Sequence, residues 1–346
     1  MQVGSRSSFD VVENWERPAA GWAHQDVVDV AVDSGDRVYL LTRMDPRVFV
    51  YDRDGNPIEV WGQGDLSERP HGITIGRDDH LYIVDEADHT IRKYDKRGKR
   101  LMTIGTSGLA SDTGTDWELP TILEKIMSLK RVGPPFNRPT KVAIGPTGDI
   151  YVTDGYANAR VHRFSAEGTL VKSWGDAGSG PGQFRLPHSI CVTSDERLIV
   201  ADRENDRLQL FSLDGEYLDE WTDFHRPQGL FIDRHDRVYV TEAPWRQGFP
   251  SLRHGVIEKA MGGRITVLDS NGRILERWGD GVPTCKAGNF VDPHGVAVDS
   301  RGDLYVAEVA YSGAIRFGYA QEGCHTFQKF ERRTSSGKAA GAALGV

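Results

Sequence analysis

The stretch DPHGVAVDSRGDLYVAE, residues 292–308, is one copy of a unit that recurs along this chain of 346 residues. A short apolar strand at 294–300 is followed by a Gly-Asp turn and by a second strand that ends in an acidic residue. Third and fourth strands complete the unit, as in RVHRFSAEG at 160–168 and LVKSWGD at 170–176. Short strands separated by tight turns in this way predict a four-stranded antiparallel sheet.

The unit occurs six times, and its copies begin near Asp26, His71, Thr140, His188, Gln228 and His294. A spacing of about 40–50 residues with four strands per copy is typical of a propeller blade. One such sheet is too small to bury both of its faces, so neighbouring copies must stack. We therefore expect an all-β fold, a six-bladed β-propeller with four-stranded antiparallel blades around a central channel. It is NHL-like rather than WD40-like, because the Gly-His and Trp-Asp signature is absent.

The blades account for residues 26–333, which we expect to form a single domain. Residues 1–25 form an N-terminal segment that could close the ring, and the Gly- and Ala-rich residues 334–346 are expected to be disordered. A short helix is predicted at roughly residues 118–131. Three insertions interrupt the repeat, at 106–137, 244–263 and 280–292. Long loops on a repeat scaffold commonly frame a binding site.

The net charge of −8 argues against nucleic acid or an anionic membrane as a partner, because both select basic surfaces. No apolar segment has the length of a membrane span, and the N-terminus has no apolar signal region. The three cysteines, Cys191, Cys285 and Cys324, form no metal motif, and their odd number argues against a disulfide framework. We therefore expect a cytoplasmic protein, with a Cys285–Cys324 bridge as the open alternative. The sequence does not indicate an oligomeric state.

Aligning the starts of the six units reveals a pattern of histidines. The residue after proline is His71, His188 and His294 in blades two, four and six, and Thr140 and Gln228 in blades three and five. This position begins the innermost strand, and alternate blades of a six-bladed ring are related by about 120°. Three imidazoles that converge on the axis and leave one position open predict a catalytic Zn²⁺ site, with Fe²⁺, Co²⁺ and Mn²⁺ as other candidate metals. The alternative is that blade duplication copied a turn histidine.

A second ring of polar residues follows the second strand of each unit. Arg43 and Arg203 occupy equivalent positions in blades one and four, across the channel from each other. Two guanidiniums beside a metal predict a small anionic substrate with a carboxylate. Tyr156 is a candidate general base, because nearby cations lower the pKa of a phenol. The alternatives are arginines that only pair with an acidic neighbour such as Asp202 and a tyrosine that only packs. We assign the acidic residues of this ring to the scaffold: Asp85, Asp154, Asp202 and Glu308.

Several longer phrases resemble one family, among them YVTDGYANARVHRFSAEGTLVKSWG at 151–175, PGQFRLPHSI at 181–190 and VADRENDRLQLF at 200–211. From about residue 26 to about residue 310 the chain is similar to the peptidyl-α-hydroxyglycine α-amidating lyases, or peptidylamidoglycolate lyases. That family is a six-bladed propeller with Zn²⁺ on three histidines, and it cleaves a carbinolamide to an amide and glyoxylate without a redox cofactor. The resemblance implies the ligands His71, His188 and His294, the catalytic phenol Tyr156, a catalytic Arg203 and, as a looser match, Arg43.

Two departures from the family pattern limit what the resemblance implies. The family uses an acidic residue directly after the third histidine for a structural Ca²⁺, whereas this chain has Gly295. We therefore do not expect Ca²⁺ unless Asp29, at the same position in blade one, compensates. The insertions at 106–137 and 244–263 also differ, so a peptide substrate is not assumed.

The expected activity is a metal-dependent lyase reaction that cleaves the C–N bond of an N-acyl-α-hydroxyglycine to an amide and glyoxylate or a related carbonyl acid. The substrate hydroxyl would take the open metal position, Tyr156 would accept its proton, and Arg43 or Arg203 would hold the carboxylate. No motif for NAD, flavin or ATP is present. Two alternatives stay open: a zinc-dependent hydrolase of an ester, lactone or amide, and a non-catalytic NHL propeller that acts as a binding module.

Overall fold

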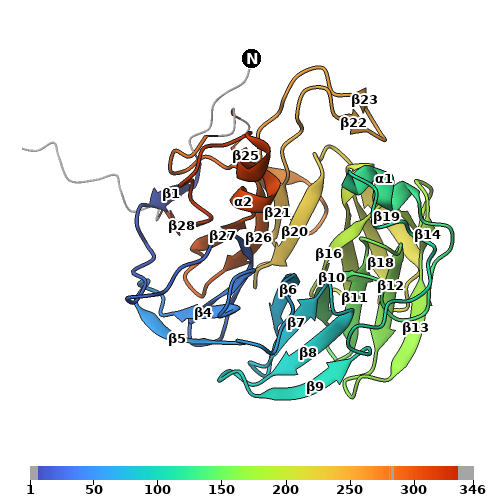
Figure 1. Ribbon diagram of the computed structural model, residues 1–346, viewed down its shortest axis with the longest axis horizontal. Coiled ribbons are helices and arrows are strands. Elements are labelled where there is room, and N and C mark those ends of the chain that lie inside the picture. The colour runs from blue at the N-terminus through green and yellow to red at the C-terminus, as the bar shows by residue number, and fades with distance from the viewer. Residues whose placement is uncertain (1–6, 280, 282–283, 334–346) are drawn as a thin grey trace, which may run out of the picture.

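Each of the first five blades begins with a largely buried apolar strand and ends with a half-exposed one. The computed structural model describes residues 7–279, 281 and 284–333, and in it six four-stranded antiparallel sheets surround a central axis (Figure 1). The predicted all-β six-bladed propeller is therefore confirmed. The tail at 334–346 and part of the insertion at 280–292 lie outside the described residues.

Every blade has one strand at the axis, and its other three strands follow outward from that strand. From the axis outward, blades one to three contain β2 (Val27–Val32), β3 (Val38–Thr42), β4 (Val48–Tyr51), β5 (Pro57–Trp61); β6 (Pro70–Ile75), β7 (Leu81–Asp85), β8 (Thr90–Tyr94), β9 (Arg100–Ile104); and β10 (Pro139–Ile144), β11 (Ile150–Asp154), β12 (Arg160–Phe164), β13 (Leu170–Trp174). In the same order, blades four to six contain β16 (Pro187–Val192), β17 (Arg197–Asp202), β18 (Arg207–Ser212), β19 (Tyr217–Trp221); β20 (Pro227–Ile232), β21 (Val238–Glu242), β24 (Arg264–Leu268), β25 (Ile274–Trp278); and β26 (Pro293–Val298), β27 (Leu304–Glu308), β28 (Phe327–Arg332), β1 (Phe9–Val12).

The tryptophans that end several units pack against glycines of the next blade. A Cβ on Gly98 would overlap the ring of Trp61, and Gly98 has a φ of +79° in the turn between β8 and β9. The same pairing recurs between Gly215 and Trp174 and between Gly272 and Trp221. Both the turn and the close approach require glycine. The recurring Trp and Gly of the sequence therefore report how one blade stacks on its neighbour.

The ring closes through strands from opposite ends of the described chain. β1 is the outermost strand of blade six, where Phe9 lies opposite Arg332 and Val12 opposite Lys329 in the antiparallel pair with β28. At the axis, each innermost strand packs beside the next, including β26 beside β2. The sixth blade is therefore complete only when residues near both ends of the chain are in place.

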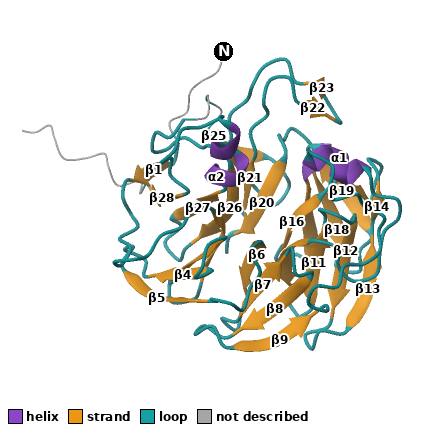
Figure 2. Ribbon diagram, in the orientation of Figure 1, coloured by secondary structure: helices purple, strands orange, loops and turns teal. Residues whose placement is uncertain are grey.

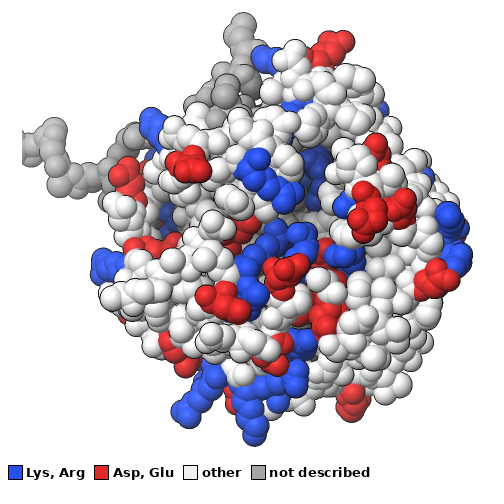
Figure 3. Space-filling view, viewed as in Figure 1, with Lys and Arg blue, Asp and Glu red and all other residues white. Residues whose placement is uncertain are grey.

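The remaining elements are short and belong to the loops (Figure 2). The insertion at 106–137 contains helix α1 (Ile122–Met127), which is shorter than the predicted 118–131 and begins with a capping box between Thr121 and Glu124. The insertion at 244–263 contains the hairpin β22 (Pro250–Ser251) and β23 (Gly255–Val256). Helix α2 (Ala310–Gly313) and the 3₁₀ turn η2 (Ile315–Phe317) follow β27. The face in Figure 3 is hollowed near its centre, where Lys and Arg side chains gather.

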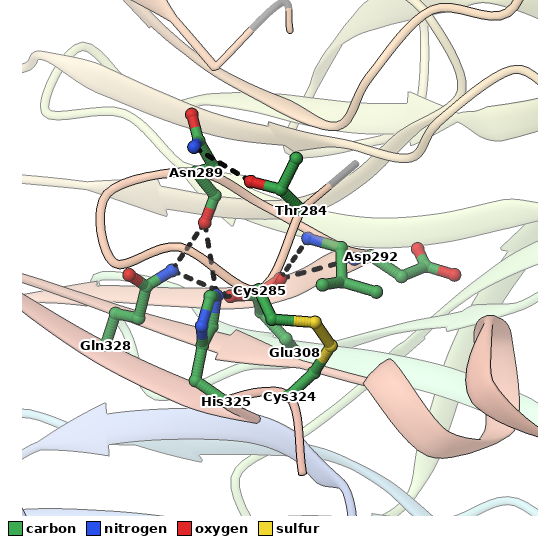
Figure 4. Close-up of a disulfide and its surroundings, with 9 residues drawn as sticks. Thr284, Cys285, Asn289, Asp292, Glu308, Cys324, His325 and Gln328 are labelled. Atoms are coloured by element: carbon green, nitrogen blue, oxygen red, sulfur yellow. Dashed lines mark hydrogen bonds and ion pairs between the residues drawn. A yellow bond between two sulfur atoms is a disulfide. The ribbon is translucent and has the colours of Figure 1, made fainter. Parts of the chain in front are cut away.

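One disulfide joins Cys285 of the loop before β26 to Cys324 of the loop before β28, and Cys191 is a buried free thiol (Figure 4). The odd number of cysteines argued against a disulfide framework, but the bridge left open as an alternative is the one observed. No helix in the described ranges is long and apolar enough to cross a membrane.

A histidine–glutamate pair lies beside this disulfide, with Glu308 buried and His325 partly buried (Figure 4). His325 Nε2 is 3.0 Å from Glu308 Oε1 and 3.1 Å from the carbonyl oxygen of Asn289. Burial disfavours the charged imidazole, but the hydrogen bond and charge of Glu308 outweigh burial and raise the pKa of His325 above its ordinary value. The stabilisation from this pair is therefore complete below the unfolded-state pKa of about 6.5 and is lost as the pH rises through the raised pKa.

We expect His325→Gln to lower the free energy of unfolding by about 1 kcal/mol more at about pH 5.5 than at about pH 9. Urea denaturation at the two pH values measures this difference. His235→Gln, at an exposed turn histidine, is the matched control and should show no such pH dependence. Equal losses for His325→Gln at both pH values would contradict the assigned ion pair.

Candidate metal centre

The three predicted ligands meet at the axis because a bulge begins each innermost strand. The antiparallel register shifts between Pro70 and Gly72 in blade two, and equivalent shifts occur at the start of β16 and β26. A bulge of this kind re-aims the side chain of the extra residue. The residues in the bulges are the histidines His71, His188 and His294. Their ring centroids are 4.7–4.9 Å apart, and one ligand atom of each lies within 4.8 Å of the others.

Each imidazole is oriented by a backbone carbonyl of a neighbouring innermost strand. The Nδ1 atoms bind the carbonyl oxygens of Thr140 at 2.8 Å from His71, Gln228 at 2.9 Å from His188, and Val28 at 2.6 Å from His294. A carbonyl only accepts, so Nδ1 donates and Nε2 keeps its lone pair. Burial, assisted by nearby positive charge, lowers the pKa of all three histidines well below the ordinary value. The site therefore presents three neutral imidazoles, a donor set that fits a divalent transition metal.

Tyr156 lies directly over these histidines. Its hydroxyl is 3.1 Å from His71 Nε2 and 3.2 Å from His188 Nε2, so it donates to one of two acceptors. Burial raises the pKa of Tyr156, and the positive charge of Arg203 opposes that shift. The ring packs with Ile126 of α1, so the insertion at 106–137 forms part of the site.

The two predicted arginines are also at the mouth of the channel and both are largely buried. Arg203 Nε donates to Glu204 Oε1 at 2.8 Å, whereas Asp202, the partner of the structural alternative, pairs with Arg207. Burial lowers the pKa of Arg43, which contacts Ser312 Oγ at 2.9 Å and lies 3.9 Å from Asp26. The structure therefore brings Arg43, Arg203 and Tyr156 together above the histidines. Their catalytic roles stay predictions.

Three further arginines line the same mouth and were missed in the sequence, where they precede the proline of three blades: Arg69, Arg138 and Arg226. Glu86 lies between Arg69, at 3.2 Å, and Arg138, at 2.9 Å. Their charges, with that of Arg43, outweigh burial and lower the pKa of Glu86. Glu204 lies 2.7 Å from Arg226 and 2.8 Å from Arg203. Burial raises the pKa of this carboxyl group, but the two positive charges outweigh burial and lower it to about 2. The Arg-Pro dipeptide that recurs in the sequence was the signal that could have revealed these arginines at the mouth.

Acidic residues at the ends of second strands fix the backbone that leads into the histidines. They are fully buried and accept backbone N–H groups: Asp85 from Ser67 at 2.8 Å, Asp202 from Arg185 at 2.7 Å, and Glu308 from Val291 at 2.7 Å. In blade three, Asp154 accepts from Asn137 at 2.7 Å. These residues have the structural role expected of them.

The ammonium group of Lys141 pairs with Asp29, the carboxylate that could have compensated for the missing Ca²⁺ ligand at Gly295. Asp29 accepts from the backbone N–H groups of Val30 at 2.9 Å and Ile73 at 2.8 Å, and it pairs with Lys141. Lys141 Nζ also donates to the Ile73 carbonyl at 2.8 Å. A Cβ on Gly295 would overlap Asp29, so an acidic residue there would collide with this pair. The carboxylate already has its counter-charge, which gives no support for Ca²⁺ at this position.

The NHL repeat family matches residues 68–94, 136–164, 184–211 and 290–316, which lie in blades two, three, four and six. The chain is 32% identical over 267 residues to peptidyl-alpha-hydroxyglycine alpha-amidating lyase 1 of Drosophila melanogaster, covering 72% of this chain and 44% of that protein. The chain is an NHL-repeat propeller homologous to the amidating lyases. The family resemblance predicted from the sequence is confirmed.

Other relatives define how far this homology extends. The chain is 31% identical over 263 residues to peptidyl-glycine alpha-amidating monooxygenase B of Xenopus laevis, covering 71% of this chain and 26% of that protein, so it spans about a quarter of that relative's length. NHL repeat-containing protein 3 of Mus musculus is 29% identical, with 81% of this chain and 76% of that protein covered. A streptogramin B lyase structure, with a TM-score of 0.54 at 14% identity and coverage of 94% and 88%, shares the fold.

We expect Lys141→Met to lower the free energy of unfolding by about 3–5 kcal/mol, because it leaves the buried carboxylate of Asp29 unpaired. Urea denaturation measures this loss, and the double change Asp29→Asn with Lys141→Met should recover much of it. The calcium chelator EGTA should leave the Tm of the unmodified protein unchanged. A lower Tm in EGTA that added Ca²⁺ restores and added Zn²⁺ does not would show that a bound calcium ion, rather than the ammonium group alone, stabilises the fold.

Proposed function

We propose that this protein is a zinc-dependent lyase that cleaves the C–N bond of a carbinolamide, an N-acyl-α-hydroxyglycine, to an amide and glyoxylate or a related carbonyl acid. The observation that carries the proposal is the set of three neutral imidazoles whose unprotonated Nε2 atoms lie beneath the hydroxyl of Tyr156. Homologues named as amidating lyases support the reaction class.

In the proposed reaction, Zn²⁺ on the three histidines would supply a Lewis acid that lowers the pKa of the substrate hydroxyl. Tyr156 accepts the hydroxyl proton, and Arg203 favours the phenolate that this requires because its charge lowers the pKa of the phenol. Arg43 and Arg203 hold the substrate carboxylate. The C–N bond then breaks, the hydroxyl oxygen becomes the carbonyl oxygen of glyoxylate, and the proton passes from Tyr156 to the leaving amide nitrogen.

The proposed reaction also indicates what kind of molecule the protein binds. A small anionic substrate with a carboxylate suits the arginines of the mouth, whereas the net charge of −8 disfavours nucleic acid and anionic membranes. The cytoplasmic location stays a prediction, and the Cys285–Cys324 disulfide is evidence against it, because disulfides persist mainly in oxidising compartments. A binding module is the competing function, because NHL repeat-containing protein 3, aligned over most of both chains, has no reaction in its name.

We expect elemental analysis to find about one zinc ion per chain, because a three-histidine site with one open position binds a single metal. His188→Ala should lose the metal while circular dichroism and cooperative unfolding are kept. His80→Ala, at a partly exposed histidine paired with Asp78, is the control and should keep the metal. A protein that contains no transition metal and takes up none on titration would favour the binding module.

We expect the protein to release glyoxylate from N-benzoyl-α-hydroxyglycine, and Tyr156→Phe to lower kcat by about 10²–10⁴-fold while zinc is retained. Tyr217→Phe, on the outer strand β19, is the matched control and should keep full activity. Full activity in Tyr156→Phe would exclude the phenol as the base. Cleavage in ¹⁸O-labelled water, with carbonyl exchange controlled, separates the lyase from a hydrolase, which alone incorporates the label irreversibly.

A further inference from the structure

Arg246 differs from the other arginines of the channel mouth because no carboxylate of a described residue lies within ion-pair distance of it. Five of the six arginines lie within 4.0 Å of a carboxylate: Arg43 near Asp26, Arg69 and Arg138 near Glu86, and Arg203 and Arg226 near Glu204. Arg246, in the insertion between β21 and β24, forms no ion pair with any described residue.

The segment between β27 and β28 contacts the Arg246 guanidinium at two points. Its central carbon lies 3.9 Å from the centroid of the Tyr319 ring, and one of its terminal nitrogens donates to the carbonyl oxygen of Gly313. Phe249 packs edge-on against Tyr319, with the ring centroids 6.2 Å apart, so that Arg246, Tyr319 and Phe249 form one platform. Tyr319 is 45% exposed and Phe249 37% exposed, so the platform is open to a ligand. A planar, stacked guanidinium with unused donors is the geometry that proteins use to bind carboxylates.

The platform borders the metal centre through blades five and six. Arg246 is within electrostatic range of Asp292, which accepts from Gln228 Nε2 at 2.9 Å. Gln228 is also the residue whose carbonyl orients His188, and Asp292 directly precedes Pro293 and His294. The platform is therefore next to the blades that carry two of the three histidines.

The charges of the mouth also point to more than one anionic group on the substrate. Six arginines line the mouth, and five carboxylates lie beside them: those of Asp26, Glu86, Glu204, Asp206 and Asp292. Positive charge is therefore in excess, and a bound Zn²⁺ would add to it. The carboxylate of the α-hydroxyglycine unit neutralises only part of this charge, so a second negative charge on the substrate would also be favourable.

We propose that the acyl group of the substrate carries a second anionic group, which binds to Arg246 where it stacks on Tyr319. The substrate class is thus an N-acyl-α-hydroxyglycine whose acyl group ends in a carboxylate. This inference rests on the proposed function for the reacting end of the substrate and adds the specificity for its other end.

The test compares two unreactive analogues, N-benzoylglycine and N-(4-carboxybenzoyl)glycine, by isothermal titration calorimetry on the zinc-loaded protein. The second analogue should bind about tenfold tighter or more, because it adds a charge-assisted pair worth on the order of 1.4 kcal/mol. This ratio of affinities should fall to near one in Arg246→Gln and should fall in part in Tyr319→Leu, which changes an exposed ring. Arg316→Gln removes the same charge from the neighbouring η2, where Arg316 lies over Phe317, and should keep the ratio.

Three outcomes would overturn the inference: equal affinities in the unmodified protein, an unchanged ratio in Arg246→Gln, or the same loss in Arg316→Gln as in Arg246→Gln. If Arg246→Gln weakens both analogues by one factor, Arg246 holds the glycine carboxylate and the second subsite is wrong. Failure of both analogues to bind would also overturn it. Glyoxylate release from N-benzoyl-α-hydroxyglycine tests the lyase function separately, since that substrate has a neutral acyl group.

Discussion

Six innermost strands must close around one axis, and this constraint determines the rest of the structure. The side chain at the bulge of each strand faces the axis, so blades that alternate in sequence become blades that converge in space. His71, His188 and His294 meet for this reason, and the blades between them supply carbonyls that orient the imidazoles. The candidate metal centre is thus a property of the ring, because no single blade contributes more than one of the three histidines.

Much of this arrangement could be predicted because it repeats. The blade count follows from the period of the unit, and the approach of the three histidines follows from their alternation. Tyr156 and Arg203 were predicted as site residues from sequence motifs that resemble those of the amidating lyases. What could not be predicted depends on contacts between blades that do not repeat, such as the pairing of Lys141 with Asp29. The Arg-Pro of three lead-ins was visible, but its meaning depended on Glu86 and Glu204, which come from other strands.

The mouth of the channel concentrates buried charge, and charge of this kind is stable only when it is paired or bound. Glu86 and Glu204 each join two arginines, and these bridges hold guanidiniums in place beside Tyr156 at a site where positive charge would otherwise repel itself. The hydroxyl of Tyr156 and the donors of the arginines are therefore fixed before a substrate arrives. Preorganised charge of this type is a major source of catalytic power in enclosed sites.

The pairing of β1 with β28 has a consequence for biosynthesis. On the ribosome, blades two and four emerge with His71 and His188, but blade six can be completed only after β28 has been made and has met β1. A metal ion that needs His294 as its third ligand would therefore be bound last, when the ring closes. A shortage of metal would then leave molecules that have closed their rings but lack the ion, rather than partly folded chains.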